Sequence, residues 1–126
     1  MNILRLDHLV ITTQDIGKCL HFYVDLLGME LDESRGRYAL RFGNQKINIH
    51  CNKDEFPPVA LNVTYGSQDL CLIVEDDIES LKAELEAKSV PIELGIVERN
   101  GALGPMKSIY LRDPDGNLIE LSRYNS

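Results

Sequence analysis

The chain contains no apolar run near the roughly 18 residues that a membrane-spanning helix needs, so no transmembrane segment is expected. Its first residues lack a charged segment followed by a long apolar stretch, so we expect no signal peptide. The three cysteines, Cys19, Cys51 and Cys71, are scattered and form no CxxC motif. This usage favours a reduced, cytoplasmic compartment, with Cys19 and Cys71 as inert core thiols.

Positive charge is also scarce. The 13 lysines and arginines stand against 20 aspartates and glutamates, for a net charge of −7. A nucleic-acid-binding protein normally presents a basic face, and anionic membranes attract basic segments. We therefore expect neither as a partner. The length of 126 residues and an apolar content of 44% are those of one compact globular domain.

A faint internal repeat organises the chain. An apolar strand pattern opens on His8, and a second one opens on Asp69. The same spacing separates two aspartates that follow, Asp15 and Asp76, each placed to cap the next helix. The chain therefore has two halves that begin in the same way, with a strand, a polar cap and a helix.

Each half continues in the same way. Helices are predicted over 16–27 and 77–88, because apolar residues recur on one side at helical spacing. The strand-like segments that follow are 29–34, 38–42 and 46–50 in the first half, and 92–97, 107–111 and 118–123 in the second. The sequence thus predicts an α+β fold, in which two βαβββ modules, at about 4–51 and 68–124, form a curved mixed sheet or half-barrel cup.

Two segments fall outside the repeat. Residues 52–67 contain Phe56-Pro57-Pro58 and are predicted to be a linker, unless their length serves a function. Residues 98–106 contain two glycines and a proline, and we predict a long loop there.

The stretch from Asp113 to Leu121 is the most informative one. Its proline, aspartate and glycine residues predict a tight turn, and the apolar residues after them predict a mostly buried strand. That strand carries one carboxylate, Glu120. A carboxylate in such a place costs free energy unless a cation or strong donors meet it. We therefore expect a partner for Glu120, and His8 is one candidate.

Strand alternation and the repeat decide which side chains can meet. His8 and Asp69 occupy matching positions, as do Asn48 and Glu120, while His50 lies one pleat beyond Asn48. Imidazole, carboxylate and amide ligands suit one divalent ion such as zinc, nickel, manganese, cobalt or ferrous iron.

Four residues are candidates for binding a substrate beside that ion: Asn48, which is also a candidate ligand, and Arg37, Lys107 and Tyr110. Arg37 and Lys107 are predicted to lie beside strands of the cup, where they could hold a substrate anion. Tyr110 occupies a predicted strand, where packing is favoured over proton donation.

The segments LDHLVITTQDIGKCLHFYVDLLGME and SIYLRDPDGNLIELS resemble the opening and the close of the vicinal-oxygen-chelate superfamily, which groups glyoxalases, bleomycin-resistance proteins and extradiol dioxygenases. FGNQKINIH and GSQDLCLI are similar to the short proteins related to glyoxalase-domain-containing protein 5. The resemblance covers nearly the whole chain.

The resemblance implies a metal-dependent lyase or isomerase related to glyoxalase I, acting on a small carbonyl or vicinal-oxygen compound as a homodimer. Carried over, the metal ligands are His8 and Glu120, with Asp69 where many members have histidine. Alignment favours Asn48 as the remaining ligand, and ligand chemistry favours His50. Glu120 and Asp69 would act as acid and base.

Three other functions stay open at this stage. One is thiol transfer of the fosfomycin type, which needs a cationic pocket. Resistance proteins of this superfamily bind a drug without a metal and without turnover. Extradiol dioxygenases cleave rings with ferrous iron held by two histidines and a glutamate, which here would require His50 as a ligand.

Overall fold

The computed structural model describes all residues from 1 to 126. The chain divides into two compact units, Met1–Gly66 and Ser67–Ser126, and each is described by itself. The segment predicted to link the modules, 52–67, therefore belongs almost entirely to unit 1.

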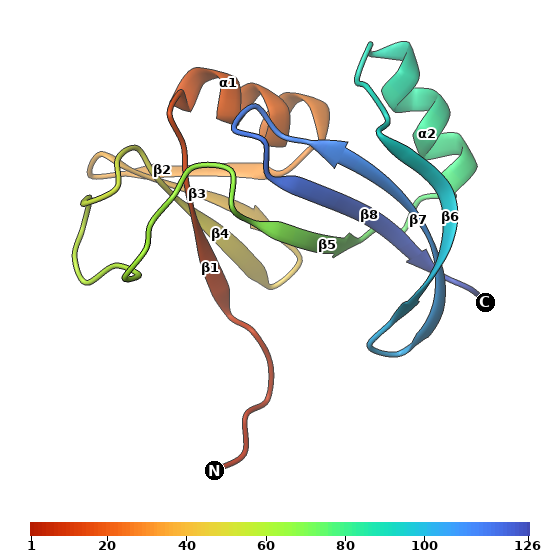
Figure 1. The fold of residues 1–126 in the computed structure, drawn as a ribbon, viewed down its shortest axis with the longest axis horizontal. Coiled ribbons are helices and arrows are strands. Elements are labelled where there is room, and N and C mark those ends of the chain that lie inside the picture. The colour runs from red at the N-terminus through yellow and green to blue at the C-terminus, as the bar shows by residue number, and fades with distance from the viewer. The chain divides into compact units, whose positions relative to one another are not determined.

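Both units have the predicted order of elements (Figure 1). Unit 1 contains β1 (His8–Thr12), α1 (Ile16–Leu20), the π-helical turn η1 (His21–Leu26), β2 (Glu30–Ser34), β3 (Arg37–Phe42) and β4 (Gln45–His50). Unit 2 contains β5 (Asp69–Ile73), α2 (Ile78–Ala87), β6 (Leu94–Gly101), β7 (Gly104–Arg112) and β8 (Leu118–Tyr124).

The two units repeat one sheet topology. Unit 1 has the strand order β1-β4-β3-β2, and unit 2 has β5-β8-β7-β6, each with one parallel pair followed by antiparallel pairs. The register repeats as well, because His8 pairs with Lys46 in unit 1 and Asp69 pairs with Leu118 at the matching positions of unit 2. The predicted α+β class and the two βαβββ modules are confirmed.

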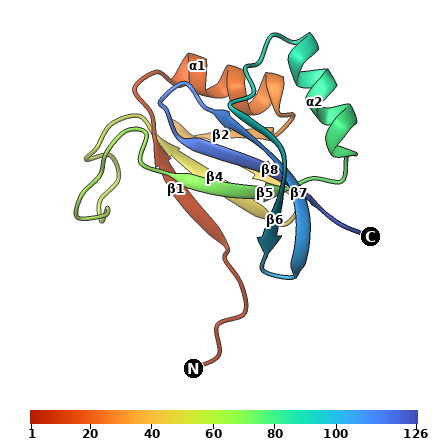
Figure 2. The ribbon, with the colours of Figure 1, turned by 45° about the vertical axis from the view of Figure 1, so that its right-hand side comes forward.

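Each sheet has an apolar face and a more polar face, as alternation requires. In unit 1 the buried strand residues include Ile11, Leu40, Ile47 and Ile49. The helical segment of α1 and η1, on one side of this sheet in Figures 1 and 2, contributes its own buried residues, Cys19, Phe22 and Tyr23. In unit 2, α2 buries the predicted stripe of Ile78, Leu81 and Leu85.

In unit 2 the aspartate that caps the helix lies one residue later than the repeat predicts. Asp15 caps α1 by accepting a hydrogen bond from the backbone N of Lys18 at 3.1 Å, as predicted. In unit 2 the cap is Asp77, which accepts from the backbone N of Ser80 at 3.1 Å, so the prediction of Asp76 was wrong. Asp76 and Asp77 are neighbours of the same residue type, so the sequence alone did not show which of them caps the helix.

The predicted loop at 98–106 was also wrong. Its residues extend β6 and β7 into one long hairpin, in which Arg99 pairs with Met106 and Gly101 with Gly104. The glycines mark the tight end of this hairpin, where Gly104 has φ +135°.

None of the helices is long and apolar enough to cross a bilayer.

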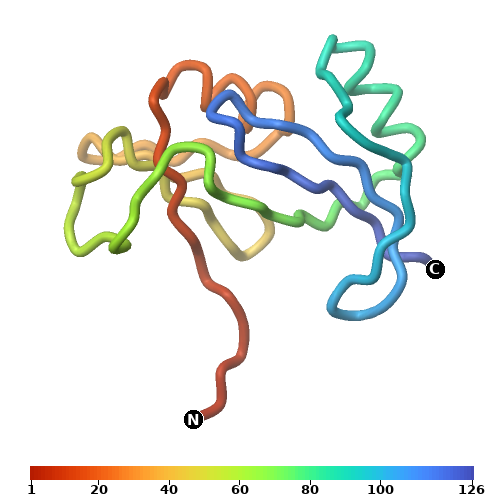
Figure 3. The backbone as a smooth tube through the Cα atoms, in the orientation of Figure 1, coloured from red at the N-terminus to blue at the C-terminus, as the bar shows by residue number.

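Residues 51–66 form an irregular excursion after β4, visible in Figure 3. It is anchored at its base, because the Glu55 carboxylate accepts hydrogen bonds from the backbone N of Cys51 at 3.2 Å and from Nδ2 of Asn52 at 3.1 Å. This anchoring places the following residue, Phe56, against the sheet of unit 1.

Candidate functional site

The polar face of the unit 2 sheet carries Glu120 at its centre. Register places Glu120 of β8 between Cys71 of β5 and Tyr110 of β7. One carboxylate oxygen, Oε2, accepts hydrogen bonds from the hydroxyls of Ser108 at 2.7 Å and Ser122 at 3.1 Å. The partner that the sequence demanded for this carboxylate is therefore, within unit 2, a pair of hydroxyl donors.

Both serines are completely buried, and their hydroxyl oxygens lie 2.6 Å apart. They hold Oε2 in place and leave Oε1 with no hydrogen-bond partner in the structure, which is the atom through which the carboxylate could bind a cation or a proton. Sequence reasoning missed Ser108. The signal was present in the pattern, because alternation places Ser108 and Tyr110 on one face of β7.

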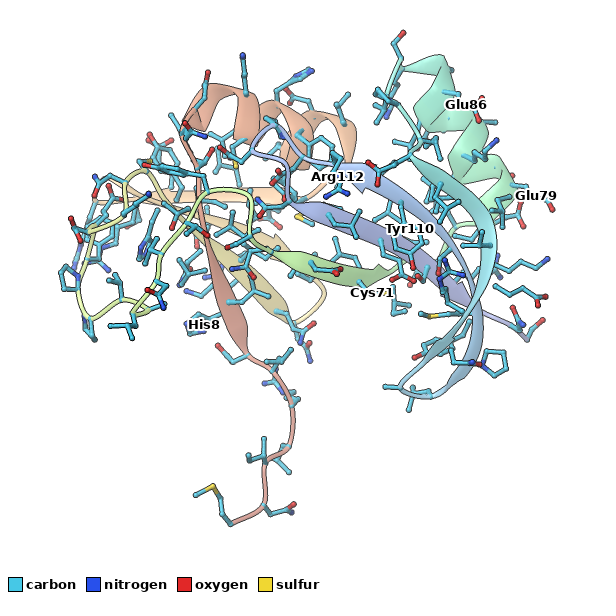
Figure 4. The ribbon with its side chains drawn as sticks, in the orientation of Figure 1. His8, Cys71, Glu79, Glu86, Tyr110 and Arg112 are labelled. Carbon is cyan, nitrogen blue, oxygen red and sulfur yellow. The ribbon has the colours of Figure 1, made fainter.

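Cys71 was predicted to be an inert core thiol, and the exposure part of that prediction was wrong. The residue is exposed on the polar face of β5, in the position labelled in Figure 4. Its Sγ lies 3.2 Å from the hydroxyl oxygen of Ser122. Partial burial of the thiol group raises the pKa of Cys71, and the nearby carboxylates of Glu120 and Asp69 raise it further.

The raised pKa gives a test of this cluster. We expect Cys71 to alkylate slowly with iodoacetamide at neutral pH, because only the thiolate reacts. In the Glu120→Gln variant one repelling charge is gone, so the pKa of Cys71 falls and its alkylation accelerates several-fold. Mass spectrometry of the modified peptides measures both rates. Cys51 is the internal control, because burial and Glu55 raise its pKa instead; equal acceleration of both thiols would contradict the cluster.

Two other predicted residues lie near this cluster. Asp69 stands on the same face as Glu120, two residues away in register, about 7 Å along the strands. Tyr110 lies opposite Glu120, and its hydroxyl accepts a hydrogen bond from Nε of Arg99 at 2.9 Å. The structure therefore brings Asp69, Glu120 and Tyr110 together on one face.

Lys107 does not join them. It pairs with Arg123 of β8, an odd number of residues from Tyr110, so its side chain projects from the opposite face of the sheet. There it lines a shallow pocket with Asp77 and Glu79 at the start of α2. Lys107 therefore lies on the opposite side of the sheet from Glu120 and Tyr110.

The turn that precedes β8 fixes the start of this strand. Asp113 Oδ1 accepts hydrogen bonds from the backbone N of Asp115 at 3.0 Å and of Asn117 at 2.9 Å, and its Oδ2 accepts from Asn117 Nδ2 at 2.8 Å. Asn117 Oδ1 in turn accepts from the backbone N of Gln68 at 2.8 Å. The predicted turn thus ties the start of β8 to the start of β5.

In unit 1, His8 opens β1 on the polar face of its sheet. Its Nδ1 lies 2.8 Å from Oδ2 of Asp7, and this hydrogen bond lowers the pKa of Asp7. When Nδ1 carries the proton, Nε2 is left with its lone pair, the arrangement by which a carboxylate orients a metal-binding histidine. The imidazole is 44% exposed and accessible to a ligand.

Strand register distinguishes Asn48 from His50, the two candidates for the remaining metal ligand. Asn48 pairs with Val10, two residues from His8, and this repeats the relation of Glu120 to Asp69. His50 pairs with Thr12, four residues from His8, which is about 13 Å along the strands. Ligand distances near 2 Å do not let two imidazoles that far apart share one ion easily. Geometry within unit 1 therefore favours Asn48 over His50 as the companion of His8.

His50 belongs instead to a pocket of about 620 Å³ on the polar face of unit 1. Among the residues that line it are Arg37, Lys46, Asn48, His50 and Phe56. The Arg37 guanidinium carbon lies 3.9 Å from the centre of the Phe56 ring, and the His50 ring meets Phe56 edge-on at 5.5 Å. Phe56, in the predicted linker, was missed because nothing in its local sequence shows what it contacts.

The donor types fit a divalent metal, but neither unit gathers a full ligand set by itself. Three or more histidine, cysteine, aspartate or glutamate side chains do not cluster as metal ligands anywhere in the structure. Each unit offers two matching positions, His8 and Asn48 in unit 1, and Asp69 and Glu120 in unit 2.

Comparison with known proteins finds relatives that are nearly half identical to this chain. The chain is 47% identical over 124 residues to the glyoxalase domain-containing protein RDO1 of Mycosarcoma maydis, covering 98% of this chain and 70% of the relative. It is also 47% identical to the crystal structure of virulence protein STM3117 from Salmonella typhimurium, with a TM-score of 0.95 over 99% of this chain and all of that one.

More distant solved structures share the fold alone. They include a lactoylglutathione lyase from Agrobacterium tumefaciens, at 21% identity and TM-score 0.74 over 97% of this chain and 95% of the other. TnmS3, an antibiotic binding protein from Streptomyces, is 22% identical with a TM-score of 0.74 over 99% of both chains. The model of the Glyoxalase/Bleomycin resistance protein/Dioxygenase superfamily matches residues 5–121, and the chain belongs to this family.

Proposed function

We propose that the protein is a metal-dependent, glyoxalase-like lyase or isomerase acting on a small carbonyl or vicinal-oxygen compound. The observation that carries the proposal is Glu120, whose Oε2 is held by two buried serine hydroxyls while Oε1 stays available. An acid or base needs an oxygen that can exchange a proton, and Oε1 meets this need.

The metal would be zinc, nickel, manganese, cobalt or iron. The ligands that we propose are His8 and Asn48 within unit 1, and Glu120 and Asp69 within unit 2. Within each sheet the two candidate ligands are related by register in the same way, which supports treating both pairs as candidates. When bound, such an ion acts as a Lewis acid that stabilises an oxyanion on the substrate. Glu120 would move the proton, and Asp69 is the second candidate for that role.

Elemental analysis of the purified protein tests the metal, and a screen of small carbonyl compounds, with and without a thiol, tests the reaction. We expect about one divalent ion per chain and turnover that a chelator removes. A protein that binds no divalent ion and turns over nothing in the screen contradicts the proposal.

Asp7 gives a narrower test of His8 as a ligand. In Asp7→Asn the carboxylate that orients the imidazole is lost, and we expect metal affinity to fall about 10- to 100-fold, as for outer-shell partners of metal-binding histidines. Titration with a competing chelator measures it. Asp54→Asn is a matched control at an exposed site. Equal affinity in wild type and Asp7→Asn would argue that His8 binds no metal.

A second candidate is a binding protein without turnover. The pocket of unit 1 favours it, because Arg37, Asn48 and Phe56 line a cavity of about 620 Å³ that could hold a small molecule. Saturable binding of a small molecule by chelator-treated protein, with no product over long incubation, distinguishes this function. Ring cleavage is favoured less, since His50 lies far from His8 in register.

We also propose that the protein is a cytoplasmic homodimer with a small-molecule substrate and no nucleic-acid or membrane partner. The acidic net charge supports the last point. Light scattering after gel filtration tests the dimer, and a mass of about 14 kDa, that of one chain, would refute it.

A further inference from the structure

The pocket of unit 1 concentrates positive charge on an acidic protein. Of its lining residues, Arg35, Arg37 and Lys46 are basic, and Asp32 is the one acidic residue. The Asp32 carboxylate is already engaged, because its Oδ2 accepts a hydrogen bond from Nε of Arg41 at 2.8 Å. The rest of the chain is strongly acidic, so an anion attracted here is attracted by this local cluster.

Arg37 differs from Arg41, Arg99 and Arg112, whose guanidinium groups are engaged. Arg112 makes a bidentate pair with Glu93 at 2.9 and 3.0 Å, and Arg99 donates to the Tyr110 hydroxyl and to a backbone carbonyl. Arg41 is held by Asp32. Arg37 has no hydrogen bond or ion pair, and its contact is with the face of the Phe56 ring.

The contact with Phe56 positions the guanidinium. The guanidinium carbon lies 3.9 Å from the ring centre of Phe56, and none of the five N–H donors makes a hydrogen bond within the protein. A planar fork of donors held in this way matches the two oxygens of a carboxylate. The amide of Asn48 and the ammonium of Lys46 line the same pocket and are likewise without side-chain hydrogen bonds.

We propose that this pocket binds a carboxylate group of the substrate, with Arg37 as the principal binding residue and Phe56 as its support. The inference rests on the proposed function in taking a small carbonyl compound as the substrate, and it narrows that class to carbonyl compounds that carry a carboxylate. Asn48 connects the pocket with the proposed metal ligands, because it lines the pocket and also occupies the candidate ligand position near His8.

Pyruvate and pyruvamide are the probes, because they have nearly the same shape and differ in charge. They are titrated into the full chain in the presence of a chelator, so that binding through a metal is excluded, and nuclear magnetic resonance follows the arginine Nε–H and asparagine amide signals. We expect saturable pyruvate binding that shifts the Arg37 and Asn48 signals, and at least tenfold weaker binding of pyruvamide.

Variants assign the effect to the pocket. Arg37→Gln is expected to weaken pyruvate binding about 10- to 100-fold, the range for a lost charge-assisted pair of hydrogen bonds. Arg37→Lys restores only part of it, because an ammonium lacks the fork. Phe56→Leu weakens binding less than Arg37→Gln, since the charge remains. Arg5→Gln, which removes the same charge from the exposed N-terminal segment, leaves binding unchanged.

The inference is overturned when pyruvate fails to bind saturably, when pyruvamide binds equally well, or when Arg37→Gln binds like wild type. These outcomes leave the proposed function untouched, because that function fails on metal content and on the dependence of turnover on Glu120. Inorganic phosphate, titrated in the same way, separates a carboxylate site from a general anion site: phosphate binding tighter than pyruvate also overturns the inference.

Discussion

Replacing Glu120 by glutamine is expected to reduce turnover about 100- to 10,000-fold, the usual contribution of a positioned acid or base. We expect the Glu120→Gln variant to keep the structure of the sheet. Glutamine has the same shape, and its Oε1 can accept the hydrogen bonds that Ser108 and Ser122 donate to the carboxylate. The sheet should therefore keep its stability, and the lost activity can be attributed to the lost charge and proton-carrying oxygen.

Metal content gives the same variant a second readout. If Glu120 is also a ligand, Glu120→Gln loses most of its bound ion, because a neutral amide is a weaker ligand than a carboxylate. Glu79→Gln is the matched control: it makes the same change on α2, where Figure 4 shows Glu79 on the helix surface. Unaltered turnover and metal content in Glu120→Gln, beside an unaltered control, would refute the proposed function.

The largest effect on stability is expected from Asp113→Ala, which should lower the free energy of unfolding by about 3–5 kcal/mol. Asp113 is 4% exposed and its carboxylate accepts three hydrogen bonds. Alanine leaves the donors of Asn117, which is fully buried, without partners. A buried donor without a partner costs its full desolvation, beyond the bond that is lost.

Urea unfolding measures this change as a shift of the midpoint at constant slope. Asp76→Ala is the control, since Asp76 is exposed and makes no side-chain hydrogen bond or ion pair in the structure, and it should change stability by less than about 0.5 kcal/mol. A midpoint for Asp113→Ala within error of this control would show that the turn contributes little to folding.

A double variant tests whether hydrogen bonding explains the loss of stability. Asp113→Asn alone sets two amide groups against each other, because Asn117 Nδ2 donates to Asp113 Oδ2. Adding Asn117→Asp restores a donor on one side and an acceptor on the other, and keeps the oxygen that accepts from Gln68. We expect the double variant to recover most of the stability lost by the single one; recovery of none would contradict the hydrogen-bond explanation.

Alternation along a strand explains both a success and an error of the sequence predictions. Residues 8 and 69, and residues 48 and 120, share matching positions because the repeat and the period of two are local properties of the chain. The same rule argued against Lys107, which is three residues from Tyr110 and so must face the other side of β7. That error lay in applying the rule, and the information was in the sequence.

By itself the sequence determined the two βαβββ modules, the turn before the last strand and the need of Glu120 for a partner, because turn chemistry and periodicity act between near neighbours. Only the tertiary structure decided which partners meet: Ser108 with Glu120, and Phe56 with Arg37 and His50. It also placed Cys71 on the exposed face. These contacts join segments far apart in the chain, and they depend on strand register and on which face of a sheet is covered, which no local pattern specifies.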